Sequence, residues 1–169
     1  RERVALTADP DSFEELWPSL QAVDRLGFVD RVPYKDKLVA TRKKLGEKDA
    51  IIVGTATIKG MPVVLAVMNF QFLGGSMGMV VGEKIALAAE KAIELGRPLI
   101  LFSCSGGARM HEGAISLMQM AKTCGALSRV DAAGLLSISV MTHPTTGGVT
   151  ASFASVCDVL LAEPNALIG

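Results

Sequence analysis

Three glycine-rich segments are the part of this sequence with the clearest chemical potential. Gly106-Gly107 and Gly147-Gly148 each separate a short apolar segment from a helical pattern, and Gly74-Gly75 precedes a third helical pattern. Paired glycines let a ligand approach the main chain closely, and a helix N-terminus behind them adds positive potential. Main-chain N–H groups placed in this way stabilise negative charge on a substrate oxygen, and one such donor is worth about 3–4 kcal/mol. A single glycine pair also fits tight packing, so it is the repetition that indicates a site.

Side-chain catalysis is not indicated by any sequence motif. There is no Ser-His-Asp arrangement with an obvious spacing, and no HExxH, GxxxxGK(S/T) or GxGxxG motif. Cys104, Cys124 and Cys157 form no CxxC pair, so we expect neither a zinc knuckle nor a disulfide framework, and their spacing favours a reducing compartment. A histidine can act as a general base near pH 7, but we interpret His111 and His143 as neutral polar groups of the loops.

The segments around the glycines predict an α/β domain with largely parallel strands. Two β-branched stretches flank Lys59-Gly60 and predict a β-hairpin at residues 50–58 and 61–70. Strands and helices then alternate, and in such sheets ligands bind at the carboxyl ends of the strands, so the three glycine loops should form one site. The predicted elements are a helix that ends at Gly96, a strand at 99–103, a helix at 112–127, a strand at 135–141, a loop at 142–148, a helix at 149–156 and a strand at 158–162.

The first 48 residues are more charged than the rest and contain several prolines. Asp11-Ser12 followed by Glu14-Glu15 predicts a helix N-terminus there. Residues 35–48 carry most of the basic charge and fit either a solvated surface helix or a docking face for a phosphate-bearing ligand. We therefore expect an amino-terminal extension, residues 1–48, packed on a core at residues 49–169 that is truncated at its carboxyl end, as in the central part of a longer polypeptide.

The composition excludes several classes of protein. Half of the 169 residues are hydrophobic and the formal net charge is zero, which excludes intrinsic disorder and any bulk attraction to nucleic acid or an anionic membrane. The longest apolar runs have the length of strands, so no transmembrane helix is expected, and no signal peptide opens the sequence. The predicted helix at 112–127 is apolar on nearly all sides, which indicates that it is buried in an assembled complex.

The segments around the glycines closely resemble the carboxyltransferase β-subunit family of bacterial and plastid acetyl-CoA carboxylases. The resemblance runs from about Tyr34 to the end of the chain. The segments that carry it are Phe102–Met110, Leu117–Lys122 and Pro144–Ala154, with further similarity at Asn69–Gly78 and Ala162–Gly169.

This resemblance implies a crotonase-like (ClpP/crotonase) fold of repeated ββα units and a biotin-dependent carboxyltransferase. The implied reaction moves a carboxyl group from carboxybiotin, on the biotin carboxyl carrier protein, to acetyl-CoA and gives malonyl-CoA for fatty acid synthesis. Loss of carbon dioxide from carboxybiotin leaves a biotin enolate that removes the α-proton of the thioester, so the cofactor supplies the base. The implied partner is a carboxyltransferase α subunit that shares the active site, in a hetero-oligomer of two α and two β subunits, in the bacterial cytoplasm or the plastid stroma.

The resemblance also assigns roles to the glycine loops. Gly147 and Gly148 match the oxyanion-hole glycines of the family, and Gly106 and Gly107 match a second glycine turn that lines the acyl-CoA pocket. Two such loops supply the two donors in crotonase-like proteins.

Four further residues are assigned to substrate binding. Gly74, Gly75 and Ser76 match a loop near the CoA moiety. Arg109 either contacts a CoA phosphate or a carboxylate, or is a structural ion-pair partner near Glu112.

The sequence departs from the family at two positions and lacks one element. Gln is usual in the family at the position of His111, and Asp at that of His143. The family's four-cysteine zinc ribbon is absent from this chain, so we assign no metal ligand here and expect zinc only in such a ribbon. The alternatives are another crotonase-like acyl-CoA enzyme, such as a propionyl-type carboxyltransferase, a hydratase, an isomerase or a peptidase using Glu112, His111 or His143, and a non-catalytic scaffold subunit.

Overall fold

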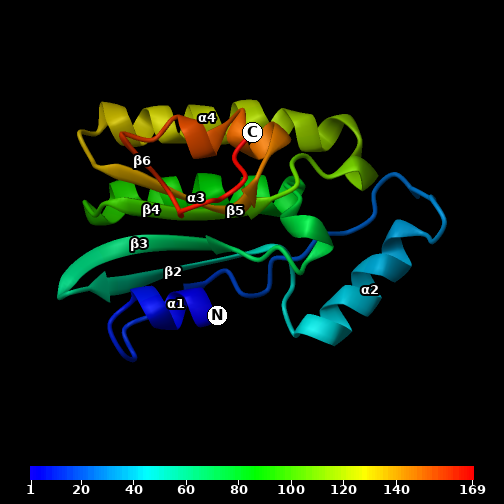
Figure 1. Ribbon diagram of the computed structural model, residues 1–169, viewed down its shortest axis with the longest axis horizontal. Coiled ribbons are helices and arrows are strands. Elements are labelled where there is room, and N and C mark those ends of the chain that lie inside the picture. The colour runs from blue at the N-terminus through cyan, green and yellow to red at the C-terminus, as the bar shows by residue number, and fades with distance from the viewer.

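The chain is built around a six-stranded sheet whose strands lie side by side in chain order, as the computed structural model of residues 1–169 shows (Figure 1). β2 is antiparallel to both of its neighbours, β1 and β3, and the pairs from β3 to β6 are parallel. Parallel pairing places the carboxyl ends of β3, β4 and β5 at one end of the sheet. The strands are β1 (Glu14–Leu16), β2 (Ile51–Ile58), β3 (Met61–Met68), β4 (Leu99–Ser105), β5 (Ser137–Thr145) and β6 (Val159–Ala162).

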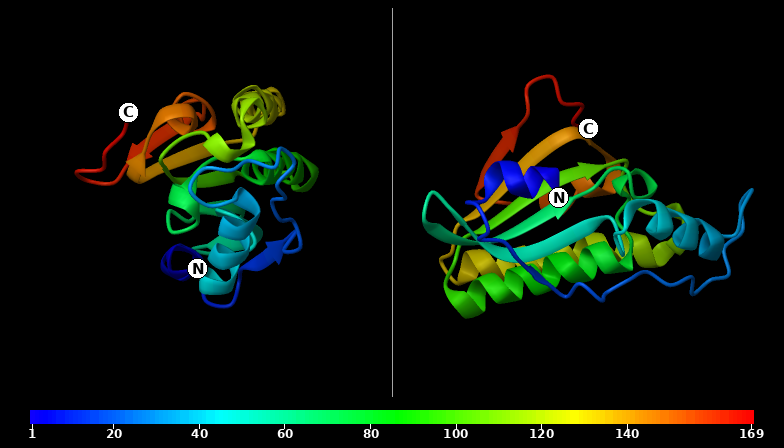
Figure 2. Two further views of the ribbon diagram at one scale, coloured as in Figure 1. Left: turned by 90° about the vertical axis from the view of Figure 1, so that its right-hand side faces the viewer. Right: turned by 90° about the horizontal axis from the view of Figure 1, so that it is seen from below.

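Helices cover the sheet unequally. The long helices α3 and α4 run along each other on one side of the molecule, with α3 against β2 and β3 (Figure 2). The helices are α1 (Glu2–Thr7), α2 (Tyr34–Leu45), α3 (Met79–Leu95), α4 (Ala114–Ala132) and α5 (Gly147–Thr150), with short 3-10 turns η1 (Leu73–Gly75), η2 (Met110–Glu112) and η3 (Phe153–Ser155). None of these helices combines the length and hydrophobicity that crossing a bilayer requires.

The alternation of side chains along the hairpin divides the core into two parts. Ile51 and Val53 belong to the main cluster, which includes the apolar stripe of α3, whereas Ile52 belongs to a smaller cluster with Val4 of α1. Because successive strand residues point to opposite faces, α1 and α3 cover opposite faces of the hairpin. The α/β architecture expected from the sequence is thus present, including the hairpin and the end of α3 at a left-handed Gly96.

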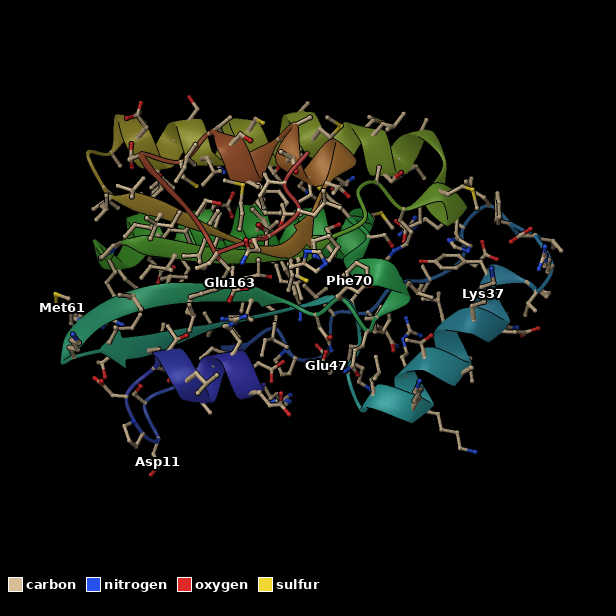
Figure 3. All side chains as sticks on the ribbon, in the orientation of Figure 1. Asp11, Lys37, Glu47, Met61, Phe70 and Glu163 are labelled. Atoms are coloured by element: carbon tan, nitrogen blue, oxygen red, sulfur yellow. The ribbon has the colours of Figure 1, made fainter.

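The predicted helix start at Asp11-Ser12 is wrong. Asp11 lies in the exposed loop after α1 (Figure 3), and Glu14–Leu16 pair with β2 as the strand β1. The carboxylate of Asp9 accepts the main-chain N–H groups of Lys59 and Gly60, both at 2.8 Å. This contact, fifty residues away in the chain, holds the segment against the hairpin turn, so the local capping pattern does not decide its conformation. The basic segment that follows does form a surface helix, α2.

The third glycine loop is shorter than predicted. β5 continues to Thr145, so residues 142–145 belong to a strand, and the next helix begins at Gly147 and ends at Thr150. The hydroxyls of Thr142 and Thr145 both donate to the carbonyl of Ser103, at 2.9 and 3.0 Å. These contacts extend the pairing with β4 beyond the apolar residues that mark the strand in the sequence.

The first half of helix α4 turns polar side chains toward the core, whereas its second half buries Ala126, Leu127 and Val130. Ser116, Gln119 and Thr123 are buried, while Leu117 and Met118 are 58% and 68% exposed. Gln119 packs directly over Gly82 of α3, where a Cβ atom would lie 2.2 Å from its Oε1. The exposed apolar side chains are available to a partner, and burial of this helix in a complex stays a prediction.

Candidate active site

The three glycine loops lie side by side at the carboxyl ends of the parallel strands. The N–H of Gly106 donates to the carbonyl of Gly74 at 2.9 Å, and the N–H of Thr146 donates to the carbonyl of Ser105 at 2.9 Å. The segment at 105–108 is therefore held between the segments at 74–77 and 145–148. Figure 3 shows Phe70 at the end of β3 that leads to these loops and Met61 at the other end, so the hairpin turn is remote from the site.

Gly107 leaves little room for a side chain and Gly75 leaves none. Gly107 has a φ of +115°, and a Cβ atom there would lie 3.3 Å from the nitrogen of Gly148. Gly75 has a φ of +63°, and a Cβ atom would lie 2.0 Å from the carbonyl oxygen of Cys104. Residues other than glycine are strained at such φ values, so these positions require glycine on conformational as well as steric grounds.

Most amides of the glycine loops are already used within the chain. Gly106 donates to Gly74, Gly107 donates to Ser105 Oγ at 2.9 Å, and Gly147 donates to the carbonyl of Gly169 at 2.7 Å. These three glycines therefore contribute backbone conformation and close approach, and not free donors, to the site.

Two neighbouring amides have no acceptor within the chain, those of Ala108 and Gly148. Met77 donates to the carbonyl of Gly107 and accepts from the N–H of Arg109, as in a parallel bridge, so the N–H of Ala108 faces the other way. On that side, a Cβ atom on Gly148 would lie 3.5 Å from the nitrogen of Ala108. The arrangement offers two adjacent main-chain donors from two different loops, which is what stabilisation of an oxyanion requires. The sequence pattern had pointed to the glycines and missed Ala108, because nothing local tells which amide stays unpaired.

The site is open on the side of these amides. Gly106 and Gly147 are exposed, and Ala108 and Gly148 are half-buried. The two largest cavities, of about 450 and 470 Å³, lie beside α1 and include none of these four residues. This chain therefore provides one wall of the site and leaves the facing wall open.

Arg109 is fully buried and forms ion pairs instead of facing the surface. Its two terminal nitrogens contact the carboxylate of Asp49 at 2.7 and 3.1 Å, and one of them also lies 3.3 Å from Glu112 Oε1. Burial alone would lower the pKa of Arg109, but the Asp49 carboxylate outweighs it, so the pKa is raised and the guanidinium stays charged. Of the two interpretations of Arg109, the geometry supports the ion-pair partner.

Ser76 and Gly74 differ in how they are placed. Ser76 Oγ accepts from Arg109 Nε at 3.1 Å and donates to the carbonyl of Leu73 at 2.9 Å, so its hydroxyl is occupied. Gly74 has open space around its Cα. A contact of this loop with CoA stays a prediction, and Gly74 is the residue of the loop with open space for it.

Both histidines make contacts of their own within the chain. His111 stacks on Tyr34 at 4.8 Å between ring centroids, and its Nε2 lies 3.3 Å from Lys37 Nζ on α2. Burial, and then the positive charge of Lys37, lower its pKa. His143 is exposed, and its Nδ1 accepts the N–H of Leu167 at 3.1 Å.

Glu112 is not available as an acid or base. It is buried, and its two carboxylate oxygens accept the hydroxyl of Tyr34 at 2.7 Å and the N–H of Met79 at 2.6 Å. The alternative that relies on a side-chain acid or base therefore has no support in this geometry. No group of three or more His, Cys, Asp or Glu side chains in this chain is arranged to hold a metal ion.

Solved structures assign this sheet, with its unpaired main-chain donors at the ends of the parallel strands, to the crotonase-like class of α/β proteins. A transcarboxylase 12S structure with hydrolysed methylmalonyl-coenzyme A bound matches with a TM-score of 0.82 and 28% identity, covering 100% of this chain and 30% of that one. A Pseudomonas malonate decarboxylase hetero-tetramer in complex with malonate matches with a TM-score of 0.75 and 27% identity, covering 99% of this chain and 59% of that one.

The chain belongs to the carboxyl transferase domain family, whose sequence model matches residues 1–167. The acetyl-coenzyme A carboxylase carboxyl transferase subunit beta of Thermus thermophilus is 57% identical over 169 residues, which is 100% of this chain and 59% of the relative. The protein of the same name from Prochlorococcus marinus is 54% identical over 168 residues, 99% of this chain and 57% of the relative. The chain thus spans less than three fifths of the length of these curated relatives, and the family expected from its motifs is confirmed.

Proposed function

We propose that this chain is the core of the β subunit of an acetyl-CoA carboxylase carboxyltransferase. The full protein would transfer a carboxyl group from carboxybiotin, held on the biotin carboxyl carrier protein, to acetyl-CoA and so form malonyl-CoA for fatty acid synthesis. The observation that carries this proposal is the pair of neighbouring main-chain amides, those of Ala108 and Gly148, that have no acceptor within the chain. The relatives in the preceding section supply the substrate class.

The main chain of the two loops holds the negative charge of the reaction. The N–H groups of Ala108 and Gly148 donate to one enolate oxygen, and a pair of preorganised donors of this kind lowers the barrier because it needs no reorganisation. Gly106, Gly107 and Gly147 fix the turns that aim these donors, since their own amides bind within the chain. When bound, carboxybiotin supplies both the carboxyl group and the base, which explains why no basic side chain is required here.

This chain forms only one wall of the site, so we expect a partner subunit to form the other. We expect the carboxyltransferase α subunit to close it and to cover the exposed Leu117 and Met118 of α4, in an assembly of two α and two β subunits. The biotin carrier then enters between the subunits. Zinc belongs to a ribbon outside this chain, and the bacterial cytoplasm or the plastid stroma is the expected compartment.

The test uses the full-length protein assembled with its α subunit. Malonyl-CoA-dependent carboxylation of biotin is measured for the parent and for Gly147→Val and Gly148→Val. Each change should lower kcat by about 100-fold, because it displaces a donor or blocks the oxygen that the donor binds. Rates that stay within twofold of the parent would show that the oxyanion-hole assignment is wrong. Loss of activity in His143→Asn, with the glycine variants unaffected, would point to side-chain acid or base catalysis instead.

A further inference from the structure

A buried polar cluster joins the amino-terminal part of the chain to the second glycine turn. We call it the Arg109 cluster, and it consists of Tyr34, Asp49, Ser76, Arg109 and Glu112. Three of these side chains are charged and all three are nearly inaccessible: Arg109 and Asp49 have side chains that are 0% exposed, and Glu112 6%. Charged groups are rarely buried this deeply unless they are paired, so the cluster needs every one of its partners.

The guanidinium of Arg109 uses all five of its N–H groups inside this cluster. Nε donates to Ser76 Oγ at 3.1 Å, and one terminal nitrogen donates to Asp49 at 2.7 Å and to the carbonyl of Ser76 at 2.8 Å. The other terminal nitrogen contacts Asp49 at 3.1 Å and the hydroxyl of Tyr34 at 3.2 Å. No donor is left for a substrate, so Arg109 cannot act by direct contact with one.

Arg109 also lies next in the chain to Ala108, whose amide is free. Its own N–H donates to the carbonyl of Met77 at 2.9 Å, and the N–H of Met77 donates to the carbonyl of Gly107 at 2.8 Å. The residues on both sides of Ala108, Gly107 and Arg109, are therefore hydrogen-bonded to the main chain of Met77. The Arg109 side chain adds two hydrogen bonds to Ser76, which precedes Met77. Together these contacts fix the segment that carries the donor to the segment at 74–77.

From these contacts we infer that Arg109 is a positioning residue: anchored by Asp49, it holds Ser76 and thereby sets the direction of the Ala108 amide at the reacting oxygen. This inference rests on the proposed function for its catalytic consequence. It also assigns a role to the segment around Asp49, which lies outside the glycine loops and supplies the counter-ion.

Two variants separate positioning from simple stability. Arg109→Lys keeps the buried positive charge opposite Asp49 but cannot make all four bonds to the two Asp49 oxygens and the two Ser76 oxygens, because a lysine has only three donors, all on one atom. The combined change Arg109→Met, Asp49→Leu and Glu112→Gln removes all three charges of the cluster together, so no buried charge is left without a partner. Asp9→Asn is the matched control, because it weakens a different polar contact of the amino-terminal part, the one with the hairpin turn, which is far from the site.

The measurements use the full-length protein with its α subunit. For both Arg109 variants we expect kcat to fall about 10- to 100-fold, while KM for the acyl-CoA stays within about threefold, because a misdirected donor weakens only transition-state binding. Asp9→Asn should lower the unfolding temperature without changing kcat. An Arg109 variant that folds and keeps kcat within twofold of the parent would overturn the inference, as would a loss of kcat in Asp9→Asn that matches its loss of stability.

A second readout does not depend on activity. In the full-length protein labelled with ¹⁵N-alanine and ¹⁵N-glycine, Arg109→Lys should move the amide resonances of Ala108 and Gly148, and Asp9→Asn should leave both unchanged. Unmoved resonances in Arg109→Lys would contradict positioning. A parent complex without carboxyl transfer would instead refute the proposed function, and the amide shifts would still decide whether Arg109 positions Ala108.

Discussion

Replacing Gly107 by alanine tests the geometry of the site most directly. The added methyl carbon would lie 3.3 Å from the nitrogen of Gly148 and 3.4 Å from the Cα of Gly147, so the third loop has to move by a few tenths of an ångström. The φ of +115° adds backbone strain of about 1–3 kcal/mol for any residue with a side chain. Both effects fall on the two segments that carry the free donors.

The expected result is a fall in kcat of about 100-fold, since loss of one preorganised donor costs 10²- to 10³-fold and small displacements cost nearly as much. The assay is malonyl-CoA-dependent carboxylation of biotin by the full-length protein with its α subunit, with the unfolding temperature measured in parallel. Gly96→Ala is the control: Gly96 also has a positive φ, of +60°, but has open space around it at the end of α3. It should lose about 1 kcal/mol of stability and no activity. The reasoning is refuted if Gly107→Ala folds with an unfolding temperature like that of the control and keeps kcat within twofold of the parent.

Three further predictions concern stability. Gly75→Ala should destabilise the chain by about 3 kcal/mol or more in denaturant titrations, because its Cβ would overlap the carbonyl oxygen of Cys104; a smaller loss would mean that the loop at 74–77 is not held as tightly as described. The hydroxyl of Thr57 and then the N–H of Gly60 lower the pKa of Asp9. The carboxylate therefore contributes to stability above the pKa of the unfolded state, and this contribution is lost as the pH falls through the pKa of the folded state. Asp9→Asn should flatten the dependence of stability on pH below about 4, and an unchanged curve would contradict this. Burial, and then the charge of Lys37, lower the pKa of His111 in the folded state. The unfolded state therefore takes up the proton at a higher pH, and stability falls as the pH drops below about 6.5. His111→Gln should remove this loss of stability in urea titrations between pH 7 and 5, and a variant that follows the parent would exclude His111 as the source of the loss.

Much of the fold was predictable because it follows from local patterns. The hairpin at residues 51–68 and the helix α3 carry strong periodicity and clear end signals, such as Lys59-Gly60 and Gly96, and both form where expected. The predicted helix start at Asp11 was wrong because hydrogen bonds between Asp9 and the distant hairpin turn fix the conformation of this segment. Capping preferences describe a segment by itself, and a contact fifty residues away overrides them.

The site was predictable only as far as its loops. Their glycines stand in the sequence, but whether an amide is free depends on which segments pair with it. The N–H groups of Gly106 and Gly147 donate to the carbonyls of Gly74 and Gly169, whereas the N–H of Ala108 stays unpaired. No sequence motif marks Ala108. Arg109 remained ambiguous in the sequence because its counter-ion Asp49 is sixty residues earlier.

The amino-acid sequence alone determined the alternating α/β order and the places where the chain must turn without side chains. Only the tertiary structure decided that the N–H groups of Ala108 and Gly148 stay unpaired and that the charged side chain of Arg109 is buried. The physical reason is that hydrogen bonds saturate. Each N–H group serves one acceptor, and the acceptors that claim the amides of the glycine loops come from distant segments that meet only when the sheet forms.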